Sequence, residues 1–132
     1  MGEGRVERTQ VRRLLSVVAI GFGLVTAAAG GSVLVGRDPG YVVYRPLVIF
    51  NSLMGLVYCG TGIVAWRSLL RGRILAGAVL ALNLAALAAV IFVALVGGAV
   101  ALDSVRAMVF RSVVWLALFL SYWWLARAGQ VR

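Results

Sequence analysis

Positions 74–102 read ILAGAVLALNLAALAAVIFVALVGGAVAL, an uninterrupted run of uncharged residues between Arg73 and Asp103. A helix of about 20 apolar residues crosses the hydrocarbon core of a bilayer. The run is longer than that, and it lacks the alternation of polar and apolar residues that marks a strand of a membrane barrel. It therefore predicts a transmembrane helix, over about residues 74–98.

Three further runs resemble it, and the connections between the runs are short. A turn sequence, Arg37-Asp38-Pro39-Gly40, follows the first run, a basic loop (67–73) follows the second, and Asp103-Ser104 can cap the last helix. Short loops join antiparallel neighbours. We therefore expect one domain (1–132), an all-α integral membrane protein with four transmembrane helices in an up-down antiparallel bundle. The predicted spans are residues 14–36, 46–66, 74–98 and 105–126.

Composition supports the same class and excludes several others. Of the 132 residues, 63% are hydrophobic and 13% are charged, whereas soluble domains are about half apolar and about a quarter charged. The chain has no His and one cysteine, Cys59, so His-ligated haem or zinc and a disulfide within the chain are excluded. It also lacks a Ser-His-Asp set, a phosphate loop and paired carboxylates. We expect no enzyme, no cofactor and no metal.

Charge predicts the orientation. All thirteen basic residues are Arg, and the net charge is +9. Arginines that flank spans set topology, and the richer side faces the cytoplasm, so we expect both termini there, in a bacterial inner membrane, with anionic lipid at the Arg clusters and no nucleic acid partner. The richer side carries Arg5, Arg8, Arg12, Arg13, Arg67, Arg71, Arg73, Arg127 and Arg132, and the other carries Arg37, Arg45, Arg106 and Arg111.

The N-terminal region leaves one alternative open. The first span is longer than the 7–15 apolar residues of a signal peptide, so we expect it to be retained. The ten residues at the start of the chain either extend the first helix or are disordered.

Few polar residues lie within the spans. Tyr58 and Asn83 lie at similar depths in neighbouring spans, at about 1.5 Å of rise per residue, so they can form an interhelical hydrogen bond that fixes register, or line a pathway. Asn51 lies at the depth of Gly30 and Gly31. It can contact them closely or line a shallow outward pocket.

Arg111 is the most unusual of the charged residues. About 22 Å of helix, at about 1.5 Å per residue, separates it from Arg127, which is short for a hydrocarbon core of about 30 Å. Either Arg111 snorkels to the outer interface, or an acid, Asp38 or Asp103, holds it in the protein. A buried Arg111 could receive an anion or a lipid headgroup.

Small residues at four-residue spacing let membrane helices approach closely. Such rows pack within one chain or between copies, and packing within the chain is the simpler expectation. The last span is instead bulky, and Trp115 and Phe119 fall on one face of it, which we expect to face lipid or a partner protein. The rows with this spacing are Ala19-Gly23-Ala27-Gly31 and Gly77-Ala81-Ala85-Ala89, and Gly55, Cys59 and Gly62 share one face of the second span.

Two functions follow as hypotheses. The first is an accessory or assembly subunit that binds a membrane partner through the fourth helix and the Arg-rich cytoplasmic face. The alternative is a small homo-oligomeric channel or transporter, because four helices seldom enclose a pathway alone. In that alternative, the lining residues would be Asn51, Tyr58, Asn83 and Arg111.

Overall fold

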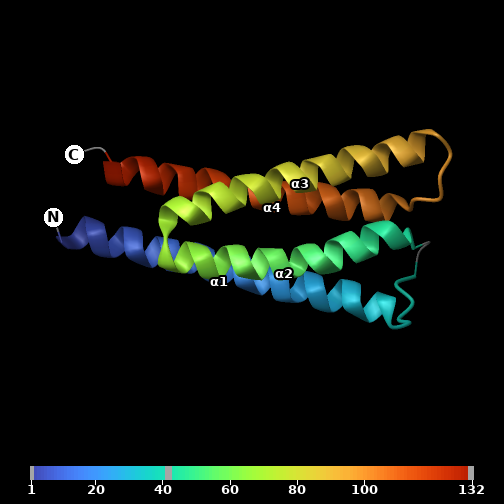
Figure 1. Ribbon diagram of the computed structural model, residues 1–132, viewed down its shortest axis with the longest axis horizontal. Coiled ribbons are helices and arrows are strands. Elements are labelled where there is room, and N and C mark those ends of the chain that lie inside the picture. The colour runs from blue at the N-terminus through green and yellow to red at the C-terminus, as the bar shows by residue number, and fades with distance from the viewer. Residues whose placement is uncertain (1, 41–42, 131–132) are drawn as a thin grey trace.

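The computed structural model describes residues 2–40 and 43–130, which form four helices. Each is long and apolar enough to cross a membrane, which confirms the prediction of an all-helical fold with four such helices. Figure 1 shows two antiparallel hairpins with both ends of the chain on the same side. We call this side the terminal end, and the opposite side the loop end. The helices are α1 (Gly2–Leu34), α2 (Arg45–Arg67), α3 (Leu69–Leu95) and α4 (Leu102–Gln130).

The helix boundaries differ from the predicted spans. Helix α1 begins at Gly2, so the region before the first span is helical. The basic loop predicted over 67–73 is wrong: Ser68 alone joins α2 to α3, and its hydroxyl accepts a hydrogen bond from the Arg71 backbone N–H at 3.4 Å. Helix α4 begins at Leu102, so Asp103 and Ser104 lie in its first turn and do not cap it.

Helices α1 and α2 pack with their backbones in contact. A Cβ atom built on Gly23 would lie 2.6 Å from the carbonyl oxygen of Gly55 and 2.7 Å from the backbone nitrogen of Cys59. Gly55 in turn meets Ala27. The small-residue rows of these two helices therefore pack within the chain, as expected. Gly31 faces open space, and Gly30 contacts Ser52 instead.

The two hairpins meet mainly along α2 and α3, while α1 makes few backbone contacts with α4. A large cluster of buried side chains fills the middle of the bundle and the terminal end, with Tyr58, Trp115 and Tyr122 as its biggest members. A smaller cluster, Leu47, Val90 and Met108, lies toward the loop end.

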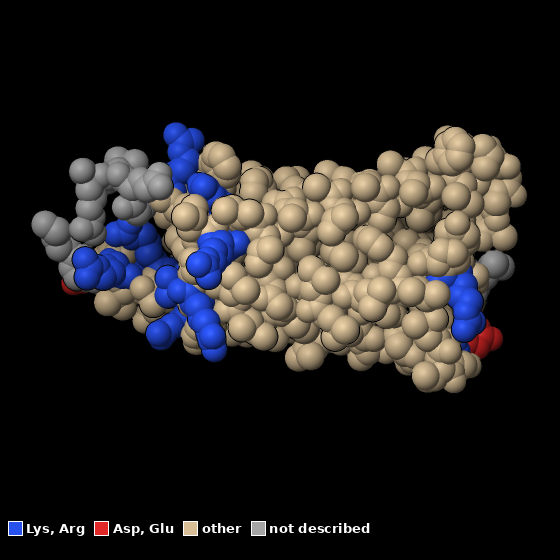
Figure 2. All heavy atoms as spheres, viewed as in Figure 1, with Lys and Arg blue, Asp and Glu red and all other residues tan. Residues whose placement is uncertain are grey.

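Charged side chains gather at the two ends of the molecule. Figure 2 shows arginines at both ends, more of them at the terminal end, and a broad uncharged band between. An uncharged band around four apolar helices indicates a membrane-embedded protein. Arg132, which was counted at the terminal end from the sequence, lies outside the described residues.

Candidate functional site

A cavity of about 80 Å³ lies at the loop end, between α1, α2 and α4. Six of its lining residues are apolar and four are polar: Arg37, Asn51, Ser104 and Arg111. No acidic side chain is among the described residues that line it. The site therefore combines two positive groups with two neutral polar groups at the end of the bundle.

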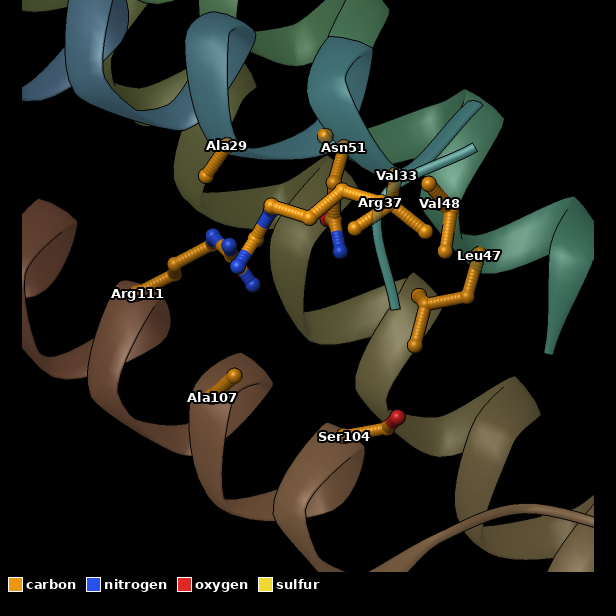
Figure 3. A pocket seen from close by; sticks show the side chains of 10 residues that line it. Ala29, Val33, Arg37, Leu47, Val48, Asn51, Ser104, Ala107 and Arg111 are labelled. Carbon is orange, nitrogen blue, oxygen red and sulfur yellow. The ribbon is translucent and has the colours of Figure 1, made fainter. Parts of the chain in front are cut away.

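The two arginines reach the cavity from different parts of the chain. Figure 3 shows the side chains of Arg37, from the connection after α1, and Arg111, from α4, directed toward each other. The Nε atom of Arg37 donates a hydrogen bond to the Ser32 hydroxyl at 2.8 Å, which fixes the direction of its guanidinium. One terminal nitrogen of Arg111 lies 4.0 Å from the Met108 sulfur.

Asn51 completes the polar side of the cavity from α2. Asn51 is 7% exposed, and its Oδ1 atom has no hydrogen-bond partner among the described residues. Figure 3 shows its amide nitrogen directed into the cavity. A buried polar group without a partner costs about 1–3 kcal/mol, so a ligand that donated a hydrogen bond to Oδ1 would gain part of that free energy.

Asp38 and Asp103 are the candidate partners in the alternative in which an acid holds Arg111, and neither lines the cavity into which Arg111 points. Asp38 instead accepts a hydrogen bond from the Gly40 backbone N–H at 2.9 Å, within its own turn. Asp103 is exposed in the first turn of α4. Among the residues that the structure describes, the walls of the cavity therefore carry two guanidinium groups and no carboxylate.

A second pair of polar residues, Tyr58 and Asn83, lies deeper than the cavity, in the interior of the bundle. The Tyr58 hydroxyl donates a hydrogen bond to Asn83 Oδ1 at 2.8 Å, and both side chains are fully buried. The predicted interhelical contact between these two residues is therefore confirmed. Asn83 Nδ2 is buried with no hydrogen-bond partner among the described residues.

The expectation for the bulky face of the fourth helix is wrong at Trp115. That residue is 0% exposed, and its ring stacks against Tyr58 with 4.8 Å between ring centroids. Trp115 fills the interior because α4 turns this face toward α2. Phe119 is half-buried: a Cβ atom built on Gly77 would lie 3.0 Å from its ring.

The four residues proposed as a channel lining thus divide between two places. Asn51 and Arg111 meet at the cavity, and Tyr58 and Asn83 meet in the interior. Sequence reasoning missed Arg37 and Ser104 as members of the cavity. The available signal was that both lie on the same predicted side of the membrane as Arg111.

Arginine–tryptophan pairs at the terminal end were also missed. The guanidinium of Arg13 lies 5.3 Å from the centroid of the Trp66 ring, and that of Arg73 lies 4.8 Å from the Trp123 ring. Cation–π contacts of this kind contribute about 0.5–1 kcal/mol at exposed sites, so they hold the helix ends together.

A row of small residues on α3 faces outward. Ala81, Ala85 and Ala89 are all exposed, and only 17% of the most apolar window of α3 is buried. Beside this row, an apolar groove of about 370 Å³ lies between α2 and α3, and Tyr44 and Phe50 are among its other lining residues. We call Ala81, Ala85 and Ala89 the α3 row.

Comparison with protein-family models, with curated proteins and with solved structures finds no match to this chain.

Proposed function

We propose that the protein is a non-enzymatic membrane protein that acts as an accessory or assembly subunit. In this proposal, α3 packs against a transmembrane helix of a different membrane protein. The observation that carries the proposal is the α3 row, Ala81, Ala85 and Ala89, which lies exposed on the most apolar helix of the chain. This moves the partner surface from the bulky face of α4, where Trp115 is buried, to α3.

The chain itself shows what such a row does. In α1 and α2, residues at the same four-residue spacing bring Gly23 and Gly55 into backbone contact. Apolar side chains alone give no driving force between helices in lipid, so association depends on close packing. A lipid-facing surface has no need of small residues, whereas a surface that receives a second helix does.

The groove beside the α3 row adds room for the side chains of that helix. It is apolar, about 370 Å³ in volume, and includes Ala85 and Ala89 in its lining. A branched or aromatic side chain on the partner helix would fit between Phe50 and the row. Small residues on one helix and large ones on the other pack well against each other.

The proposed setting is a bacterial inner membrane with the terminal end in the cytoplasm. The support is the arginine distribution, because the positive-inside rule places the Arg-rich end there. Arg67, Arg71 and Arg73 lie close together at that end, around the connection between α2 and α3. Clusters of this kind attract anionic lipid with about 1 kcal/mol per basic residue near the surface.

The alternative, a homo-oligomeric channel or transporter, has less support. A dimer formed through the α3 row would not bring Asn51 and Arg111 to the shared interface, since they lie between α1, α2 and α4. Tyr58 and Trp115 fill the interior between that cavity and the terminal end. Accessory binding requires no such pathway.

Site-specific photo-cross-linking tests the proposal in intact membranes. A benzophenone side chain replaces Phe92, which is already large, is exposed on α3 and lies three residues beyond Ala89, on the same side of the helix. A matched one replaces Phe110, which is exposed on α4. We expect one discrete adduct with another membrane protein from position 92 and none from position 110. Ala89→Leu should abolish that adduct, because the larger side chain blocks close approach, and Ala28→Leu, at an exposed position of α1, should leave it unchanged.

Two results would contradict the proposal. Equal or diffuse labelling from both positions would mean that α3 faces only lipid. An adduct of twice the 14.0 kDa chain mass would favour the homo-oligomeric alternative instead.

A further inference from the structure

The cavity at the loop end has a feature that the proposed accessory role does not use. Arg37 and Arg111 point toward each other across its polar side, and like charges held close together repel each other. A negative group between them would turn that repulsion into two attractions. The arrangement of the two side chains therefore suits an anion.

Asn51 supplies a second, independent observation. Its side chain comes from a different helix and is buried at 7% exposure. Its amide nitrogen points into the same cavity as the guanidinium groups, and a neutral donor next to two cationic donors is the pattern expected where an oxygen-rich anion binds. Its Oδ1 atom is an acceptor with no hydrogen-bond partner among the described residues, and a phosphate that keeps one proton can donate to it while accepting from the other groups.

We infer that this cavity binds a compact oxyanion, a phosphate group, between Arg37 and Arg111 with the Asn51 amide as a third donor. The cavity of about 80 Å³ has the room of two or three waters, at about 30 Å³ each, so the bound group is small or is the end of a larger molecule. A phosphate carries oxygens on all sides and can accept hydrogen bonds from guanidinium groups that approach from opposite directions, whereas a carboxylate presents only one edge.

The phosphate could come from the headgroup of an anionic lipid or from free phosphate in solution. The cavity lies at the loop end, next to the edge of the apolar band where lipid headgroups lie. The inference does not depend on a partner at α3, because the α3 row and the cavity are formed by different helices.

The experiment compares the two sources in one system. The full-length chain is purified in dodecyl maltoside micelles in phosphate-free buffer, and its thermal midpoint is followed by tryptophan fluorescence. One arm adds inorganic phosphate, against chloride at equal ionic strength. The other adds phosphatidylglycerol, against an equal amount of uncharged diacylglycerol, and native mass spectrometry counts retained lipid.

We expect a rise in the thermal midpoint in at least one arm, since a ligand that binds only the folded state stabilises it. The arm that responds identifies the source. Arg37→Gln and Arg111→Gln should each raise the half-saturating concentration about tenfold or more, as expected for loss of hydrogen bonds to a charged group. The matched control is Arg106→Gln, on the same helix as Arg111, exposed and outside the cavity lining; it should leave binding unchanged.

Three results would overturn the inference: no shift in either arm, a shift that survives both cavity substitutions, or an equal loss with Arg106→Gln, which would indicate attraction by surface charge alone. If Arg111→Gln does not fold, Arg37→Gln decides, because Arg37 lies at an exposed position outside the helices.

Discussion

At the scale of the residue, the depth of a residue along its helix correctly predicted a contact between two polar side chains, but the sequence did not predict where an aromatic side chain packs. Tyr58 and Asn83 were paired from their depths alone, and they form a hydrogen bond of 2.8 Å. Trp115 was misplaced because α4 is apolar on every side, so hydropathy does not reveal which face is buried. Only the packing of α4 against Tyr58 determines it.

The Tyr58–Asn83 hydrogen bond should contribute a small but measurable stability. We expect Tyr58→Phe and Asn83→Leu each to lower the free energy of unfolding in detergent, and the double substitution to cost less than the sum. The coupling should be about 0.6 kcal/mol, the average for such bonds in membranes, measured by a double-mutant cycle. Strict additivity of the two effects would show that the hydrogen bond does not form in the membrane protein.

At the scale of the element, the rows of small residues predicted close packing of α1 and α2, and the structure has it at Gly23, Ala27 and Gly55. The sequence did not distinguish these rows from the α3 row, which faces outward. The spacing of small residues shows that another helix can pack closely there, but it does not show which helix does so. The observed helix boundaries also differ from the predicted spans. Charged residues mark the edge of an apolar span, but a helix continues through them, as α1 does from Gly2.

Backbone contact between α1 and α2 makes Gly23 intolerant of any side chain. Gly23→Ala places a methyl group against the Gly55 carbonyl, and we expect a loss of about 1–3 kcal/mol, typical of overpacking. The matched control, Gly21→Ala, has open space around its Cβ position, so it should be neutral or slightly stabilising, since Ala favours helix over Gly. Thermal unfolding in detergent compares the two, and equal midpoints would contradict the packing described.

At the scale of the whole molecule, hydropathy and charge were enough to predict four membrane-length helices with short connections. The loop-end cavity could not be predicted in the same way. It requires the last turns of α1 and the connection after it, the first turns of α2 and the first turns of α4 to meet, and no local pattern encodes how two hairpins pack on each other. Arg37 was therefore interpreted only as a topology signal.

The proposed orientation gives a prediction for labelling of intact cells. In a Cys59→Ala background, a membrane-impermeant maleimide should label the chain carrying Asp38→Cys in intact cells. It should label the chain carrying Ser68→Cys only after permeabilisation, because Ser68 joins α2 to α3 at the Arg-rich end. The reverse pattern would place the termini outside, and labelling of both positions in intact cells would indicate mixed orientation.

The mass and composition of the native complex test the accessory role most directly. The complex is extracted from its own membrane in a mild detergent, weighed intact, and every protein in it is identified, for the wild-type chain and for Ala85→Leu. We expect the wild-type chain in a fixed ratio with one different membrane protein, and the 14.0 kDa chain alone when Ala85 is enlarged. A wild-type complex built only from copies of this chain, or a partner that remains bound to Ala85→Leu, would contradict this role for α3.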